Sequence, residues 1–131
     1  RFRSAEEGTK FEGKVLVAED NEVNQVVIKR YLNKLGAVVS LANDGESAFE
    51  QASKETFDII FMDLQMPKLN GLEAGKKLMS SGCETPIYAL TADPDKQTQY
   101  ECEAVGFCGV LLKPIDKVAI KNTLTDHLKI I

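Results

Sequence analysis

The sequence has few of the residues that mark several classes of protein. Its 131 residues include three cysteines, one histidine and no tryptophan. The cysteines, Cys83, Cys102 and Cys108, are odd in number and lack a CxxC spacing, so the sequence predicts neither a disulfide framework nor a zinc site. We interpret them as reduced, cytosolic thiols that are buried like small hydrophobic residues.

Long apolar runs are also missing. No stretch approaches the roughly 20 apolar residues of a membrane-spanning helix, and residues 1–12 lack the apolar centre of a signal peptide. The net charge of −4 argues against a nucleic-acid surface, because domains that bind nucleic acids are usually basic. The composition, 44% hydrophobic and 27% charged, is typical of one globular domain with a single core.

The chain alternates short apolar runs with longer segments of helical spacing. The runs are KVLVA, AVVSLA, FDIIFM, PIYAL and GVLL, at residues 14–18, 37–42, 57–62, 86–90 and 109–112. Capping residues open the helical segments, among them Asn21, Asp44, Asn70 and Asp93-Pro94. Helices between strands imply right-handed crossovers and a parallel sheet. We predict an α/β domain at residues 13–131, a (βα)5 three-layer sandwich with strand order 2-1-3-4-5, after a polar linker or tail at residues 1–12.

Reactive side chains follow four of the five apolar runs. Glu19 and Asp20 follow the first run, Asp63 the third, Thr91 the fourth and Lys113 the fifth. Because parallel strands end at the same edge of a sheet, we expect these side chains to converge there. Taken alone, Glu19-Asp20 is also an ordinary acidic first turn of a helix. Three carboxylates at one edge would repel one another, however, and their oxygens suit a hard cation such as Mg²⁺.

The predicted cluster favours phosphoryl chemistry. The Asp63 carboxylate, at the end of the central strand, can act as a nucleophile toward phosphorus. Lys113 would supply a positive charge, and the Thr91 hydroxyl a hydrogen bond to a phosphoryl oxygen.

Four stretches, in this order, resemble the receiver domains of response regulators in two-component phosphorelays: VLVAEDNEVNQ, DIIFMDLQMPKLNGLEA, TPIYALTA and GVLLKPI. The resemblance covers about Lys14 to Leu128, and the EDN.VNQ and MDLQMP stretches are similar to receivers of hybrid sensor histidine kinases. It implies a flavodoxin-like fold and a domain that takes a phosphoryl group from a phosphohistidine and then changes conformation in signal transduction.

The resemblance also implies a metal site. Asp63 would be the phosphoacceptor, and Asp20 and Asp63 would bind Mg²⁺ directly. Glu19 would bind the ion through a water molecule, and the backbone carbonyl of Gln65 would be a further ligand. Mn²⁺ would be able to substitute for Mg²⁺.

The expected switch lies on the other side of Asp63. The resemblance implies that Thr91 moves toward the phosphoryl group, that Ala92 is the small neighbour that leaves room for it, and that Lys113 contacts the phosphoryl group. The Lys113-Pro114 bond would be cis, which proline permits. One departure concerns Val110, where receivers usually have an aromatic residue that changes rotamer on phosphorylation.

The first predicted helix, from about Glu22 to Leu35, has more apolar residues than one buried face needs. Its predicted core stripe consists of Val27, Ile28, Tyr31, Leu32 and Leu35. Val23 lies at the rim of that stripe and Val26 lies outside it. Scattered apolar surface residues are one interpretation of these two valines. The other is a docking surface for the phosphodonor, a role that this helix commonly has in receivers.

The phosphoryl group is expected to come from a partner. The single histidine, His127, lacks the acidic flank of a phosphodonor and is interpreted as a helix-end imidazole. No glycine-rich nucleotide loop is present, so we expect no kinase activity in this chain, although a receiver assists its own phosphotransfer and dephosphorylation. The implied donor is a kinase dimerisation domain or a histidine phosphotransfer domain. The domain is expected to be cytoplasmic, without nucleic-acid or membrane contact, even if the parent protein is membrane-anchored.

Two other functions stay open on the sequence. Val110 motivates a pseudo-receiver that acts as a constitutive docking module, although the intact acidic cluster argues against it. A flavodoxin-like enzyme or a phosphatase is disfavoured, because there is no glycine-rich first loop for a dinucleotide and no DxD after the first strand.

Overall fold

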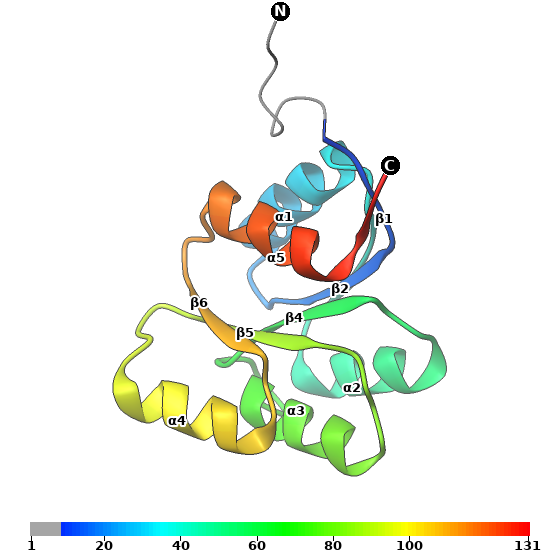
Figure 1. The fold of residues 1–131 in the computed structure, drawn as a ribbon. Coiled ribbons are helices and arrows are strands. Elements are labelled where there is room, and N and C mark those ends of the chain that lie inside the picture. The colour runs from blue at the N-terminus through cyan, green and yellow to red at the C-terminus, as the bar shows by residue number, and fades with distance from the viewer. Residues whose placement is uncertain (1–8) are drawn as a thin grey trace, which may run out of the picture.

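A computed structural model describes residues 9–131, in which a five-stranded parallel sheet is the central layer (Figure 1). Its strands are β2 (Lys14–Ala18), β3 (Val38–Ala42), β4 (Ile59–Asp63), β5 (Ile87–Thr91) and β6 (Gly109–Leu112). The helices between and after them are α1 (Glu22–Lys34), α2 (Gly45–Lys54), α3 (Gly71–Ser80), α4 (Lys96–Val105) and α5 (Lys117–His127). The strand order β3-β2-β4-β5-β6 confirms the predicted fold.

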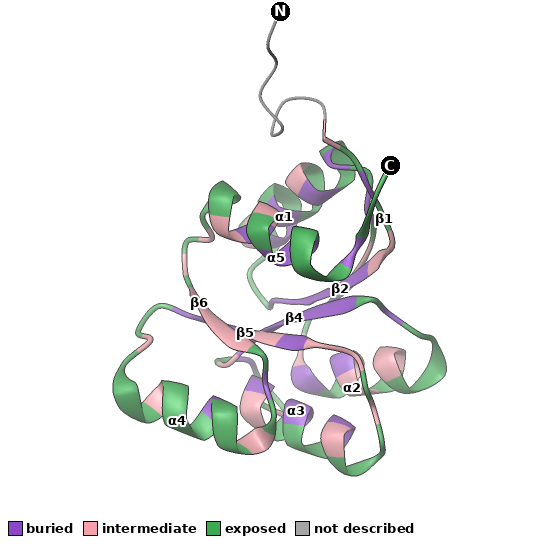
Figure 2. Cartoon of the chain, viewed as in Figure 1, coloured by how far each residue is buried: buried purple, intermediate pink, exposed green. Residues whose placement is uncertain are grey.

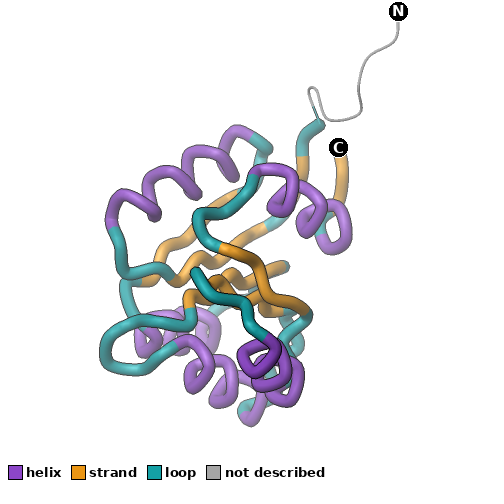
Figure 3. The backbone as a smooth tube through the Cα atoms, turned by 90° about the vertical axis from the view of Figure 1, so that its left-hand side faces the viewer, coloured by secondary structure: helices purple, strands orange, loops and turns teal. Residues whose placement is uncertain are grey.

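Two helix layers cover the sheet. Helices α1 and α5 lie on one face, and α2, α3 and α4 lie on the other (Figures 1 and 3). Side chains alternate between these layers: Leu16 and Ile60 pack toward α2–α4, whereas Val15 and Phe61 pack toward α1 and α5. Every residue of β4 is buried (Figure 2), as expected for a strand covered on both faces. Within residues 9–131, no helix is long and apolar enough to cross a membrane.

Each helix begins after a side chain that accepts a backbone N–H of its first turn, which satisfies an otherwise unpaired donor. The capping residues are Asn21, Asp44, Asn70, Asp95 and Asp116. The predicted cap of the fourth helix at Asp93-Pro94 is therefore wrong. Asp95 Oδ1 accepts the Thr98 N–H at 2.7 Å, whereas the Asp93 N–H donates to the Thr91 hydroxyl.

Residues 11 and 12 differ from the predicted tail. They form β1 (Phe11–Glu12), which pairs antiparallel with β7 (Lys129–Ile130). Phe11 is fully buried against the layer that α1 and α5 form, and its N–H donates to the Leu35 carbonyl at 2.7 Å. The predicted boundary comes too late because one buried aromatic residue stands among polar neighbours and its partner strand is at the far end of the sequence. Residues 1–8 of the predicted tail lie outside the described residues.

Helix α1 faces the sheet with a slightly different stripe from the predicted one. Ile28 and Leu32 are buried as predicted, but Val27 is 60% exposed and Gln25 only 8% exposed. The buried positions, together with Leu35 after the helix, follow a single stripe with intervals of three and four residues. Hydrophobicity alone selected Val27, because a pattern of apolar residues does not reveal that a buried amide has hydrogen-bond partners.

The cysteines differ in their exposure. Cys102 is buried as predicted, Cys83 is half-buried and Cys108 is exposed, and all three thiols are free. The expectation of a buried thiol is therefore wrong for Cys108, which comes directly before β6 at an edge of the sheet.

Candidate functional site

The carboxyl ends of four strands bring the predicted side chains to one edge of the sheet. Glu19 and Asp20 follow β2, Asp63 and Thr91 end β4 and β5, and Lys113 follows β6. Carboxylate oxygens of Glu19, Asp20 and Asp63 all lie within 4.8 Å of one another. The predicted convergence of three carboxylates is thus present. Parallel topology is its cause, because it aligns strand ends that lie far apart in the sequence.

Lys113 connects two of these carboxylates. Its Nζ lies 2.7 Å from Asp63 Oδ2 and 3.2 Å from Glu19 Oε1. Both carboxylates are almost fully buried, so this ammonium group offsets part of a charge that water does not solvate.

The electrostatics of the cluster appear in two shifted pKa values. Burial raises the pKa of Glu19, and the charge of Asp63 raises it further, against the lowering effect of the Asn21 backbone N–H and of Lys113. Burial lowers the pKa of Lys113, but the hydrogen bonds and charges of Asp63 and Glu19 outweigh burial and raise the pKa overall. The ammonium group therefore stays protonated.

The donor set fits a hard divalent cation. Three carboxylates with one nearby ammonium leave an excess of negative charge, and carboxylate oxygens are the ligands that Mg²⁺ prefers. Asp20 is exposed, so an ion bound there would keep water ligands, as Mg²⁺ usually does. The Gln65 N–H donates to Asp63 Oδ1 at 3.0 Å and holds this residue against the carboxylate. Ligation by the Gln65 carbonyl stays a prediction.

Thr91 lies beside a hollow of about 260 Å³ whose lining includes Gln65 and Asp93. The Thr91 side chain is buried, and its hydroxyl accepts the Asp93 N–H at 3.2 Å. Ala92 is exposed, and its role as the small neighbour of the switch stays a prediction. The Lys113-Pro114 bond is cis, as predicted.

Gly71 is a residue of the site that the sequence analysis did not single out. A Cβ at this position would lie 2.1 Å from the carbonyl oxygen of Asp63, so only glycine lets α3 begin this close to the end of β4. The Gly71 N–H also donates to the Leu64 carbonyl at 3.2 Å. The Asn70-Gly71 pair signals a turn but does not reveal this close approach.

Gln25 is a second residue whose role was missed. Its side-chain amide donates to the Glu19 carbonyl at 2.5 Å and to Asn43 Oδ1 at 2.6 Å. Its place in the EDN.VNQ stretch was the available signal, because apolar periodicity does not select a glutamine.

Val110, which stands where receivers usually have an aromatic residue, is half-buried. Val110 packs against the core between the sheet and the α2–α4 layer. Phe107 belongs to the same cluster but lies over Gly75 of α3, where an added Cβ would come within 2.1 Å of its ring. Phe107 is therefore buried against α3.

His127 is exposed and is the last residue of α5, as the interpretation of a helix-end imidazole requires. Its Nε2 lies 2.6 Å from the Tyr88 hydroxyl. The histidine therefore contacts a side chain of the inner strand β5 and is not part of the carboxylate cluster.

The outer surface of α1 is apolar next to the cluster. Val23, Val26 and Val27 are exposed. A hollow of about 210 Å³ separates α1 from the segment that precedes α5, and its lining includes Val27 and Ile115 together with Glu19 and Lys113. Of the three exposed valines, Val27 thus lines the same hollow as Glu19 and Lys113.

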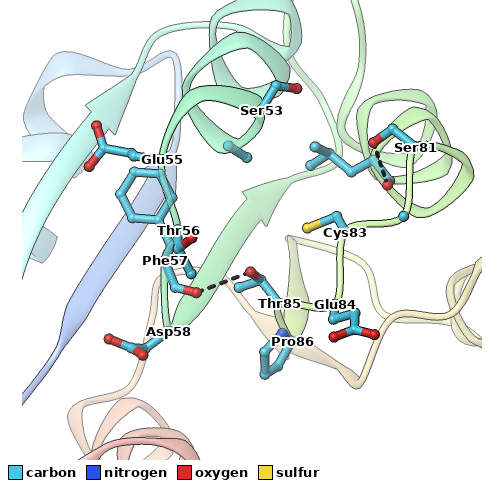
Figure 4. Close-up of a pocket in the computed structure, with 13 residues that line it drawn as sticks. Ser53, Glu55, Thr56, Phe57, Asp58, Ser81, Cys83, Glu84, Thr85 and Pro86 are labelled. Carbon is cyan, nitrogen blue, oxygen red and sulfur yellow. Dashed lines mark hydrogen bonds between the residues drawn. The ribbon is translucent and has the colours of Figure 1, made fainter.

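A larger hollow of about 650 Å³ lies at the amino ends of the strands, opposite the carboxylate cluster (Figure 4). The loops that precede β4 and β5 form its wall, where the Thr85 hydroxyl donates to the Phe57 carbonyl at 3.0 Å. The lining carries the carboxylates of Glu55, Asp58 and Glu84, and no lysine or arginine is among its described residues. None of the predicted site residues lines it, so the size of a hollow does not locate the site.

Comparison with known proteins agrees with this arrangement. A family model described as the response regulator receiver domain matches residues 15–125. The osmosensing histidine protein kinase SLN1 of Saccharomyces cerevisiae is 44% identical over 120 residues, which are 86% of this chain and 10% of that protein. The chain thus spans about a tenth of the length of this relative.

Solved structures give the same result. The receiver domain of the sensor histidine kinase PA1611 from Pseudomonas aeruginosa, with a magnesium ion in its active-site cleft, is 32% identical with a TM-score of 0.81, covering 88% of this chain and 97% of that one. A receiver complex from Saccharomyces cerevisiae, formed by the phosphotransfer protein Ypd1 and the response regulator Ssk1, matches with 28% identity and a TM-score of 0.84 over 90% of each chain. Since the family model covers nearly the whole domain, the chain belongs to the family of response regulator receiver domains.

Proposed function

We propose that this receiver domain accepts a phosphoryl group on Asp63 from a phosphohistidine of a partner protein, with Mg²⁺ bound at the carboxylate cluster. The observation that carries the proposal is the joint placement of Glu19, Asp20 and Asp63 within 4.8 Å, with Lys113 paired to Asp63. The magnesium ion in the related PA1611 receiver supports the same assignment.

Asp63 is the nucleophile of the proposed transfer. One of its carboxylate oxygens attacks phosphorus, the phosphorus–nitrogen bond of the phosphohistidine breaks, and the bonding electron pair stays on the imidazole, which then takes a proton from water. Lys113 is already hydrogen-bonded to Asp63 and balances negative charge on the phosphoryl oxygens. Hydrolysis or transfer to another histidine returns Asp63 to its free carboxylate.

Four residues would hold the ion. Asp20 and Asp63 would ligate it directly, with the Gln65 carbonyl, and Glu19 would act through water. When bound, Mg²⁺ would neutralise charge on the transferring phosphoryl group, and Mn²⁺ would do the same.

Thr91 and Ala92 form the proposed switch. In the free domain the Thr91 hydroxyl oxygen accepts the Asp93 N–H, and a phosphoryl group on Asp63 would offer a charged acceptor for the Thr91 O–H. The exposed Ala92 leaves space for the segment to follow. The phosphoaspartate thereby shifts the population between two conformations. With Val110 in place of an aromatic residue, the readout would use this segment itself.

The proposed docking surface for the phosphodonor consists of Val23, Val26 and Val27 on α1. It is apolar, exposed and continuous with the hollow that reaches Glu19 and Lys113. A helical phosphodonor can lay its own apolar face on this surface, and the related complex with Ypd1 supports a histidine phosphotransfer protein or a kinase dimerisation domain. We infer that the domain is the cytoplasmic receiver of a hybrid histidine kinase, because it matches about a tenth of SLN1, a relative named as a histidine protein kinase.

Intact mass after incubation with a small acyl phosphate and Mg²⁺ tests the phosphoacceptor. We expect the gain of one phosphoryl group, lost in Asp63→Asn and in a metal-free sample. A protein that gains no mass and does not bind Mg²⁺ would instead be a pseudo-receiver.

Val26→Lys tests the docking surface separately. We expect this variant to accept phosphate from the small donor at the normal rate but to receive it slowly from a histidine phosphotransfer protein. Val38→Lys is the matched control, because Val38 is equally apolar and exposed but opens the edge strand β3 at the other end of the sheet. Equal effects of the two lysines would rule out the α1 surface.

A further inference from the structure

We propose that Gln25 is a positioning residue for the metal site, because its side-chain amide fixes the peptide group that joins Glu19 to Asp20. The inference rests on the proposed function, since it concerns the Mg²⁺ site of the receiver.

Gln25 uses both hydrogens of its amide within the protein. Nε2 donates to the carbonyl oxygen of Glu19 at 2.5 Å and to Asn43 Oδ1 at 2.6 Å. A side-chain amide has two N–H donors, so its donor capacity is filled. The side chain is only 8% exposed, and water is therefore a poor substitute for either partner.

The Glu19 carbonyl belongs to the peptide group between the two adjacent carboxylates of the cluster. On the other side of Glu19, its N–H donates to the Ala42 carbonyl at 3.0 Å. The Glu19 carboxylate accepts the Asn21 N–H at 3.0 Å. Gln25 thus holds the carbonyl oxygen of the peptide group that joins Glu19 to Asp20.

Asn43 extends this arrangement to a second loop. It lies between β3 and α2, directly before the capping residue Asp44. The end of β3 carries none of the predicted reactive side chains, but through Asn43 and Gln25 it supports the end of β2. One amide therefore connects three segments: the loop after β2, helix α1 and the loop after β3.

Residues that orient metal ligands affect affinity without touching the ion, and their loss typically weakens metal binding by about 10- to 100-fold. In Gln25→Ala the Glu19 carbonyl loses its partner and the peptide group gains freedom. The ligands must then be ordered when the ion binds. We expect a loss of Mg²⁺ affinity near the lower end of that range, about tenfold.

Gln51 provides a matched control. Its Nε2 also donates to a strand carbonyl, that of Leu41, at 2.9 Å, and to the Ser47 hydroxyl at 3.2 Å. Within residues 9–131, no hydrogen bond joins the Gln51 side chain to Glu19 or Asn43. Calorimetric Mg²⁺ titration of Gln25→Ala and Gln51→Ala is the test, with urea unfolding in chelator to measure the structural cost of each change. We expect both variants to lose stability and only Gln25→Ala to lose Mg²⁺ affinity.

Asn43→Ala keeps the test decisive if Gln25→Ala does not fold, because Asn43 is exposed. We expect a weaker loss of Mg²⁺ affinity in the same direction. Amide exchange of the Glu19 N–H, which donates to the Ala42 carbonyl, gives a second readout without metal and should be faster in either site variant than in Gln51→Ala. Wild-type protein that binds Mg²⁺, with site variants that bind it equally well, overturns this inference alone. Wild-type protein that neither binds Mg²⁺ nor gains a phosphoryl group overturns the proposed function.

Discussion

Ion pairs of similar length lie at both ends of the sheet, in different surroundings. At the amino end, Lys14 Nζ lies 2.5 Å from Glu55 Oε1, and the two side chains are 43% and 45% exposed. At the carboxyl end, Lys113 Nζ lies 2.7 Å from Asp63 Oδ2, and the exposed fractions are 22% and 2%. Water solvates the first pair and little of the second. Burial, more than distance, therefore decides which pair perturbs its neighbours.

The hollows at the two ends of the sheet also differ in the burial of their charged groups. The amino-end hollow is larger, about 650 Å³ against about 260 Å³ beside Thr91. Its three carboxylates are exposed, whereas Glu19 and Asp63 are buried within reach of one ammonium group. Buried charges that lie close together indicate a reactive site better than the size of a hollow does, because desolvation strengthens the electrostatic interactions between them.

The largest expected effect comes from breaking the buried pair. In Lys113→Met the phosphoryl oxygens lose a positive charge, and we expect phosphorylation of Asp63 to slow by about 100-fold. Lys14→Met removes the exposed pair and is expected to leave this rate unchanged. Time courses of intact mass with a small acyl phosphate measure both variants. Equal rates for wild type and Lys113→Met would mean that the lysine has only a structural role.

A second contrast uses one glycine from each end. In Gly71→Ala the new methyl group meets the Asp63 carbonyl, so we expect a loss of about 2 kcal/mol of unfolding free energy from overpacking. Gly82, which lines the amino-end hollow, has no atom within 4 Å of an added Cβ but has φ +90°. Gly82→Ala should therefore cost about 1 kcal/mol, from backbone conformation alone. Urea unfolding measures both, and a larger loss in Gly82→Ala would contradict the close approach.

The smallest effect concerns pH. Burial, then repulsion by Asp63, raises the pKa of Glu19 above its ordinary value of 4.5, so the folded protein binds this proton more tightly than the unfolded chain. Stability contributed by Glu19 therefore falls as the pH rises from 4.5 through the folded pKa.

Glu19→Gln removes this loss. Without metal, we expect the variant to resist urea better than wild type at neutral pH, and the difference to disappear below pH 4.5. Glu55→Gln, at the exposed end, is the control and should show no such gain. A gain for Glu19→Gln that is the same at both pH values would point to packing as its cause.

Much of the site was predictable because it depends on few facts about the chain. The apolar runs located the strands to within two residues, and Glu19, Asp20, Asp63, Thr91 and Lys113 each follow or end one of them. Parallel topology then brings those ends together whatever the packing details. The caps Asn21, Asp44 and Asn70 were predictable for a similar reason, since a cap acts within one helical turn.

The sequence by itself determined the order of the helices and strands, the carboxylates at the carboxyl ends of the strands, and the family to which the domain belongs. Tertiary structure alone decided that Phe11 joins the core, that Gln25 is buried in place of Val27, and that Gly71 touches the Asp63 backbone. These features depend on partners far away in the chain or on the space between two backbones. A local pattern of apolar and polar residues carries no information on either, because the free energy of a buried amide or a missing methyl group is set by its neighbours in space.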